Sequence, residues 1–446
     1  MAEPMVTGWK CAVCGAATPI EAAFSWRCPN STEGDRHHAP QLVQGIAPLR
    51  SKGGSKGGSK GGSRGGSNPF ITFRHHLAWD AFAAARGLDD GARESLVAEL
   101  DAKVAGVAGI GFVDTPFARS DALSDALGFH LDGGVWVKDE THNVAGSHKA
   151  RHLFGILLHL VTAERTGCAP WTAPDERPPL AIASCGNAAL AAATLAASVD
   201  WPIRVFVPVA ANPAVVALLL GLRASLVECP RRSTDPPGDP CVHRFREAVA
   251  RGAVPFSVQG TENAWCLDGG RTIGWEMARH MEESIEGPPF DRLFVQVGGG
   301  AFAACIAAGF RMSGITPRLH AVQTNACAPL ERAWELASSV GGPSHVAAHW
   351  SDCMWPWEHV GHSSADGILD DETYDWLPVV RAMADGHGAP VVAHEPEVLA
   401  ANDIGCRATG IDASHTGTAG LAGLFAIREH VADDERIAVI FSGVRR

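Results

Sequence analysis

Lys149 is the residue whose type and position most clearly suggest chemistry. It follows the polar stretch 139–148 and precedes the apolar run 153–160, so the pattern predicts a lysine at the mouth of a helix. A lysine there is partly desolvated and lies near helix N-terminal dipoles, and both effects favour the free amine. The free amine is the form that attacks a carbonyl group, which indicates a nucleophile.

Three further segments combine a predicted buried strand with polar or glycine residues directly after it. In chain order these are 179–183 followed by 184–187, 291–297 followed by 298–300, and 437–441 followed by Ser442 and Gly443. Glycines between a strand and a helix let backbone N–H groups converge on an anion. The triple glycine therefore suggests a phosphate cradle, although a tight strand-to-helix turn would have the same residues.

Together and in this order, the four segments resemble the fold-type II family of pyridoxal 5'-phosphate (PLP) enzymes. That family includes threonine synthases, serine/threonine ammonia-lyases, cysteine synthase and the tryptophan synthase β chain. The resemblance covers roughly residues 68–446. The segments 262–276 and 365–368 also resemble family segments, but less closely. It implies an α/β fold with two parallel-sheet domains and PLP in the cleft between them.

The resemblance also implies roles for individual residues. Lys149 would form a Schiff base with the cofactor, Asn187 would bind its phenolic oxygen, and Ser442 would face its pyridine nitrogen. The residues expected to hold the phosphate are His148, Gly298, Gly299, Gly300 and Ala301. Those expected to bind the substrate carboxylate are Ser184, Cys185, Gly186 and Asn187.

Two positions depart from the threonine synthase pattern. His148 stands where threonine synthases and ammonia-lyases usually have Phe, and this resembles the tryptophan synthase β chain. A histidine that caps the helix is the alternative. Ala150 stands where threonine synthases have Asp, which argues against ordinary phosphohomoserine chemistry.

The reaction expected is elimination from a hydroxy or O-activated amino acid, as in serine/threonine ammonia-lyases or a threonine synthase-like lyase. A serine hydroxyl cannot protonate a pyridine nitrogen, so the ring is a weaker electron sink and loss of a leaving group is favoured over transamination. Lys149, once released, is the natural base for the Cα proton. A β-replacement synthase and a non-catalytic PLP-binding protein are the alternatives.

The N-terminal residues 1–50 form a separate Cys-rich segment that could bind zinc. Cys11 and Cys14 have the spacing that presents two thiolates to one tetrahedral ion, Cys28 would be the third ligand, and His37 or His38 the fourth. Some threonine synthases also begin with a small Cys-x-x-Cys element. Reduced cysteines in a small docking segment are the alternative.

The Gly/Ser/Lys repeat at 51–67 predicts a flexible linker, because it cannot bury apolar area. We therefore expect the N-terminal segment to act in isolation from the enzyme body. In the family's arrangement, residues 68–149 and 246–446 would form a large PLP-binding domain and 150–245 a smaller substrate domain.

Composition is that of a globular enzyme, with 46% hydrophobic and 19% charged residues. The net charge of -12 argues against nucleic acid as a partner. The start lacks a signal-peptide pattern, no run is long enough for a membrane span, and 12 scattered cysteines suggest a reducing cytoplasm. An amino-acid substrate and a homodimer are expected from the resemblance.

Overall fold

The computed structural model describes residues 6–45, 67–130, 132–284 and 290–446. Within them, the larger sheet has six strands in the order β12-β11-β10-β13-β5-β4. All neighbours are parallel except β4 and β5. The strands are β4 (Phe117–Arg119), β5 (Gly134–Asp139), β10 (Arg292–Gln296), β11 (Arg318–Thr324), β12 (Ala389–Ala393) and β13 (Arg436–Phe441).

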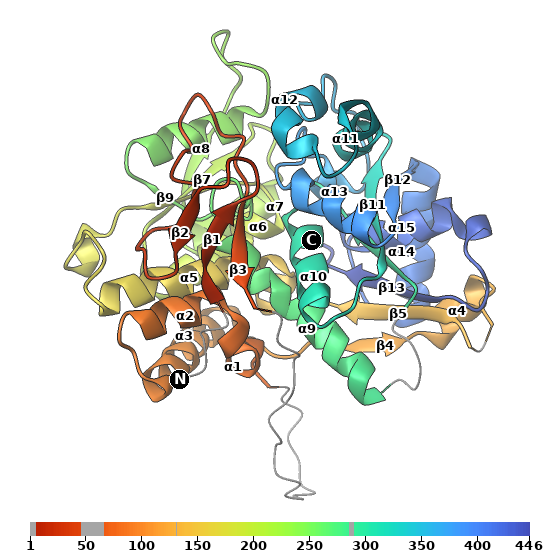
Figure 1. Cartoon of the computed structure of the whole chain (residues 1–446), viewed down its shortest axis with the longest axis horizontal. Helices are drawn as coiled ribbons and strands as arrows, with labels where there is room; N and C mark the ends of the chain where they lie inside the picture. The colour runs from red at the N-terminus through yellow and green to blue at the C-terminus, as the bar shows by residue number, and fades with distance from the viewer. Residues whose placement is uncertain (1–5, 46–66, 131, 285–289) are drawn as a thin grey trace, which may run out of the picture.

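The smaller sheet has four parallel strands in the order β8-β7-β6-β9. They are β6 (Leu180–Ala183), β7 (Ile203–Val207), β8 (Ser225–Glu228) and β9 (Val254–Pro255). Helices connect the parallel strands of both sheets, as βαβ units require. The expected α/β fold with parallel sheets is confirmed, and Figure 1 shows the two sheets side by side.

The α-helices cover these sheets and fill the space between them. They are α1 (Pro69–Thr72), α2 (Ala78–Ala85), α3 (Asp90–Ala108), α4 (Asp121–Ala126), α5 (Lys149–Arg165), α6 (Asn187–Ser198), α7 (Pro213–Gly221), α8 (Pro240–Ala250), α9 (Cys266–Ser284), α10 (Ala301–Met312), α11 (Pro329–Ala337), α12 (Trp350–Cys353), α13 (Trp376–Asp385), α14 (Glu395–Thr409) and α15 (His415–Ala426). Within the described residues, no helix is both long and apolar enough to cross a membrane.

Helix α9 joins the two halves because it packs closely on α5 and on α10. A Cβ at Gly269 would collide with the carbonyl oxygen of Arg151, and a Cβ at Gly309 would lie 2.8 Å from the carbonyl oxygen of Arg271. Glycine at these positions therefore allows close backbone approach. The helix that begins with Lys149 and the helix that follows the triple glycine are both held against α9.

One hydrophobic core combines segments that the sequence assigned to different domains. Residues of α2 and α3 share a core with α5, α6 and the smaller sheet, including Trp79, Leu100 and Phe154. From the sequence, residues 78–108 are expected in the large domain. The division of the chain into two domains remains a prediction.

The N-terminal segment forms a small antiparallel sheet of β1 (Val6–Cys11), β2 (Ala17–Pro19) and β3 (Pro40–Gln44). Val6, Trp9 and Ile20 belong to the same hydrophobic core as α2 and α5. Arg27 donates to the buried carboxylate of Glu262 at 2.7 Å. The expectation that this segment acts in isolation is therefore wrong, because its apolar face is buried against the enzyme body.

The expected linker lies almost entirely outside the described residues, of which only Ser67 belongs to it.

Candidate active site

Lys149 is the first residue of α5, directly after the loop that leaves β5. The N–H of His148 donates to the carbonyl oxygen of Ser442 at 3.1 Å, and Ser147 forms a bridge with Gly443. These backbone contacts hold Lys149 beside the end of β13. Burial lowers the pKa of the Lys149 amine, and nearby Asp370 offsets this only in part. The expected free-amine character is therefore consistent with this environment.

Asn187 begins α6 and reaches the same place from the smaller sheet. A Cβ at Gly443 would lie 2.7 Å from Asn187 Nδ2, so Asn187 lies directly against the segment after β13. Arg446 Nε donates to Asn187 Oδ1 at 2.8 Å. Because Oδ1 accepts this bond, the Nδ2 amide group is the one left to donate, as a phenolate oxygen requires.

The rest of the 184–187 segment forms the turn between β6 and α6. The N–H of Gly186 donates to Ser184 Oγ at 3.3 Å, and Cys185 is exposed. Turn and helix start therefore present Ser184, Cys185 and backbone N–H groups at one edge of the smaller sheet. An edge of this kind suits a carboxylate group.

Ser442 is buried at the end of β13, and Gln296 at the end of β10 determines how its hydroxyl is used. Gln296 Nε2 donates to Ser442 Oγ at 2.6 Å and to the carbonyl oxygen of Gly417 at 2.9 Å. The carbonyl oxygen of Gly417 can only accept, so the amide nitrogen of Gln296, and not its oxygen, must face Gly417 and Ser442. Because Oγ already accepts from Gln296, the Ser442 proton is available for an acceptor such as a pyridine nitrogen.

The triple glycine lies between β10 and α10, where Gly300 has a left-handed φ of 93°. The carboxyl group of Asp370 lies against this loop, where the backbone of Gly299 helps to lower its pKa. A Cβ at Gly298 would collide with the same carboxylate. A carboxyl group thus lies where the expected phosphate cradle is, and the role of the loop in holding the phosphate remains a prediction.

Asp370 itself is a site residue that sequence reasoning missed. Burial raises its pKa to about 6, Lys149 opposes this shift and Asp371 adds to it. A carboxyl group with this pKa can both accept and release a proton near neutral pH. It lies in the loop 365–375, which shows no helix or strand periodicity in the sequence.

His148 is buried and stacks on Phe302, with ring centroids 3.8 Å apart. Its Nδ1 lies 3.1 Å from the carbonyl oxygen of Ser442 and must therefore carry the proton that it donates. Burial holds the pKa of His148 well below its usual value, so Nε2 is an acceptor in the neutral ring. His148 could donate to a phosphate only if the phosphate itself raised this pKa.

The residues present fit PLP. Ser147 Oγ and His148 Nε2, on the N-terminal side of Lys149, are buried and have no hydrogen-bond partner within the part of the chain that the structure describes. Buried polar atoms normally have partners, so such atoms beside the glycine loop point to an absent polar ligand. Lys149, Asn187, Ser442 and the glycine loop would supply the contacts.

Beneath Lys149, a buried ion network fixes the start of α5. Arg151 Nε donates to Glu140 at 2.9 Å and Arg151 Nη1 to Glu276 at 2.5 Å, while Lys138 also pairs with Glu276. Although burial alone would lower it, the two carboxylates raise the pKa of Arg151. Burial raises the pKa of Glu276, but Arg151 and Lys138 bring it down to about 2.

The N-terminal cysteines converge as expected. Ligand atoms of Cys11, Cys14, Cys28 and His38 all lie within 4.8 Å of one another. Cys11 Sγ is 3.4 Å from His38 Nδ1, and Cys14 Sγ is 3.5 Å from Cys28 Sγ. The structure brings His38 into this cluster and not His37, whose ring stacks on Trp350.

Two signals in the sequence could have found more of the site. Gln296 is a polar residue in an otherwise apolar strand, and Asp370 lies just after the segment that weakly resembles the family's 365–368 motif. Arg446 offers no such signal, because its contact with Asn187 spans 259 positions.

Comparison with known proteins agrees with this geometry. A family described as "Pyridoxal-phosphate dependent enzyme" matches residues 110–443. No curated protein matches the chain. Solved structures with the same fold include threonine deaminase isoform 2 from Solanum lycopersicum, with TM-score 0.58 and 17% identity over 81% of this chain and 92% of that one.

Two others are a fungal L-serine ammonia-lyase from Rhizomucor miehei and maize serine racemase. The first has TM-score 0.56 and 16% identity over 75% of this chain and 94% of that one. The second has TM-score 0.55 and 16% identity over 78% of this chain and 92% of that one. At such identities the likeness shows the fold, while the family match covers most of the sequence. The chain belongs to the family of pyridoxal-phosphate dependent enzymes.

Proposed function

We propose that the protein is a PLP-dependent lyase that eliminates a β- or γ-leaving group from a hydroxy or O-activated amino acid. The observation that carries this proposal is the hydrogen bond from Gln296 to Ser442, which leaves the Ser442 hydroxyl as a neutral donor. When bound, PLP withdraws electrons from Cα of an attached amino acid, and a neutral donor at its ring nitrogen makes it a moderate sink. Loss of a leaving group then competes well against transamination.

The side chains around the site divide the remaining work. Lys149, with its lowered pKa, can hold the Cα proton after it has released the cofactor. The turn at Ser184, Cys185 and Gly186 would orient the substrate carboxylate. Asp370, with a pKa of about 6, is placed to protonate a departing hydroxyl or amine.

A second candidate differs in the substrate's side chain. A cavity of about 750 Å³ beside Asp370 is lined by Asp239, Asp371, Trp355 and Trp357. Both indole rings already stack with the guanidinium of Arg332. Arg231 also lines the cavity, but four carboxyl groups outnumber it, those of Asp239, Glu358, Asp370 and Asp371. This opening therefore favours an amino acid with a second ammonium group. Diaminopropionate ammonia lyase from Escherichia coli is similar in fold, with TM-score 0.58 and 16% identity over 79% of this chain and 88% of that one.

Product analysis separates these candidates and the β-replacement alternative. The PLP-loaded enzyme is incubated with serine, threonine, their O-phospho and O-acetyl forms, phosphohomoserine and 2,3-diaminopropionate. Ketoacid and ammonia from the oxygen-bearing substrates support the first candidate, and turnover of the diamino acid alone supports the second. Product that forms only when a thiol or indole is added indicates a replacement synthase. Racemisation without release of ketoacid would contradict the lyase proposal.

We also propose that Cys11, Cys14, Cys28 and His38 hold a structural zinc ion, since three thiols and one imidazole within 4.8 Å suit tetrahedral zinc. All four positions are taken by protein side chains, so the ion would stabilise the N-terminal sheet and would not bind substrate. A homodimer is proposed from the family resemblance, and the mass in solution tests it.

A further inference from the structure

A second cavity is lined by Asp375 and Cys305, two residues that also act electrostatically on Lys149. Its volume is about 740 Å³, and Lys149, Asn187 and Ser442 are not among the described residues that line it. β3 of the N-terminal sheet forms one side, and α9, α10 and α13 form the others. The cavity therefore exists only because the N-terminal sheet is docked on the enzyme body.

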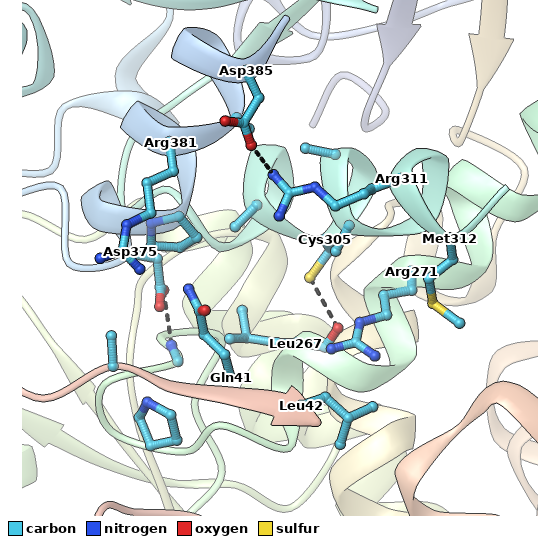
Figure 2. A pocket seen from close by; sticks show the side chains of 18 of the residues that line it. Gln41, Leu42, Leu267, Arg271, Cys305, Arg311, Met312, Asp375, Arg381 and Asp385 are labelled. Atoms are coloured by element: carbon cyan, nitrogen blue, oxygen red, sulfur yellow. Dashed lines mark hydrogen bonds and ion pairs between the residues drawn. The ribbon is translucent and has the colours of Figure 1, made fainter. Parts of the chain in front are cut away.

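Three arginines from three different helices surround this cavity. Figure 2 shows Arg271 of α9, Arg311 of α10 and Arg381 of α13 around the same space. Two carboxylates, Asp375 and Asp385, also line it. Asp385 forms an ion pair with Arg311 at 2.7 Å, and Asp375 accepts a hydrogen bond from the N–H of Gly260 at 2.8 Å. Positive charge is therefore in excess.

Arg271 is the most informative of the three. It is 5% exposed, and its Nη1 donates to Gln44 Oε1 of β3 at 3.2 Å. Its Nε is buried and has no hydrogen-bond partner among the residues described. A buried guanidinium with an unused donor is costly unless a ligand completes its bonds.

Arg381, which lines the cavity from α13, also has guanidinium donors without a partner among the described residues. Its side chain is half-buried, and burial lowers its pKa, with Asp385 as the opposing charge. Asp385 is already paired with Arg311, so Arg381 has donors to spare. Arginine pairs well with carboxylate and phosphate because its planar fork matches their oxygens.

We propose that this cavity binds a small molecule carrying a carboxylate or phosphate group, held by Arg271, Arg311 and Arg381. The cavity is separate from the catalytic cleft, and the proposal is independent of which reaction the enzyme performs. Gln41 and Gln44 of β3 would contact the ligand from the N-terminal side, so ligand binding and docking of that sheet support each other.

Asp375 connects this cavity to the cofactor site. Its carboxylate lines the cavity, and its N–H donates to the carbonyl oxygen of Gly299 in the glycine loop at 2.7 Å. It also directly precedes α13, the helix that carries Arg381. A ligand on Arg381 would therefore act on the loop that holds the PLP phosphate, and by linkage PLP would act equally on that ligand.

The experiment titrates the holoenzyme, kept in excess PLP so that the glycine loop is occupied, with inorganic phosphate and separately with succinate. Binding is followed by calorimetry and by the melting temperature, with chloride at matched ionic strength as a control. We expect saturable binding of at least one anion and a rise in melting temperature that chloride does not reproduce. The anion that binds more tightly, phosphate or succinate, shows whether the cavity prefers a phosphate or a carboxylate group.

Two variants assign the binding to this cavity. Arg381→Gln should weaken it by about tenfold or more, because a charge-assisted pair is lost. Arg407→Gln, which removes an exposed arginine paired with Asp403 far from the cavity lining, should leave it unchanged. With succinate, which lacks a phosphate group that would compete with PLP, the PLP dissociation constant should respond in wild type and not in Arg381→Gln.

Absence of saturable binding, or equal binding in wild type and Arg381→Gln, would overturn the proposal. A change of oligomeric mass in Arg381→Gln without any anion binding would also overturn it and would assign this face to a subunit contact instead.

Discussion

Lys149 and Arg151 are two residues apart on α5, and burial alone would lower the pKa of both, yet the carboxylates around them differ. Arg151 is fully buried between Glu140 and Glu276, and its pKa is raised. Lys149 forms no ion pair with a carboxylate among the described residues, and burial lowers its pKa. A completed ion network gives the loop before α5 a single arrangement, while the amine next to it has no ion pair within the described chain and is the expected nucleophile. One turn of one helix thus carries both a fully paired guanidinium and, as far as the structure describes the chain, an amine without an ion pair.

The largest effect should follow removal of the amine. Lys149→Ala should abolish the visible absorption band of the lysine-bound cofactor and lower turnover by at least about a hundredfold, since base and nucleophile are lost together. Its stability should be unchanged or increased, because a desolvated cation is removed. Absorbance, steady-state rates and urea unfolding test this. An unchanged band would show that another lysine binds PLP.

The matched change at Arg151 should have the opposite profile. Arg151→Ala leaves Glu140 and Glu276 buried with Lys138 as their one remaining cation in the network, so we expect a loss of about 3 to 5 kcal/mol in the free energy of unfolding. Urea unfolding measures it, with Arg407→Ala as the surface control. A loss no greater than that of the control would mean that the network does not hold α5.

Acid should weaken the same network over a defined range of pH. Burial alone would raise the pKa of Glu276, but Arg151 and Lys138 lower it from 4.5 to about 2 in the folded chain. Its contribution is complete above pH 4.5 and is lost as the pH falls towards 2. The stability of wild type should therefore fall more steeply in this range than that of Glu276→Gln. Parallel curves would contradict this assignment.

Metal removal tests whether the N-terminal sheet belongs with the rigid part of the molecule. Metal analysis should find about one zinc per chain, and Cys11→Ser should lose it. Because Val6, Trp9 and Ile20 pack in the core with α2, loss of the ion should also lower the melting temperature of the whole chain by a few degrees. A chain that contains no zinc would contradict the zinc site, and melting that is unaffected by loss of the ion would show that the sheet is not energetically coupled to the rest of the chain.

The smallest effect concerns the carboxyl group of Asp370, which lies against the glycine loop. Asp370→Asn should bind PLP about fivefold more tightly at pH 8, because a carboxylate no longer competes near the phosphate. Burial raises the pKa of Asp370 to about 6, so the advantage over wild type should shrink below that pH. Fluorescence titration of apoenzyme measures both. Weaker binding by the variant would show that Asp370 supports the loop and does not compete.

The resemblance to a known family predicted one part of the candidate site. Lys149, Asn187, the triple glycine and Ser442 each follow a strand or begin a helix in the family's order, and their roles remain predictions. The family and the α/β fold were predicted from the sequence on these residues and are confirmed.

Contacts between residues far apart in sequence were set by the folding of the whole chain. Whether His37 or His38 joins the cysteines depends on where Trp350 lies, because its ring stacks on His37. The proton of Ser442 is directed by Gln296, 146 positions away, and Asn187 is oriented by Arg446. The docking of the N-terminal sheet depends on buried apolar surface and on Glu262, not on the composition of the linker. Strand and helix patterns are local, whereas the direction of a hydrogen bond and the burial of a charge depend on partners that only the folded chain brings together.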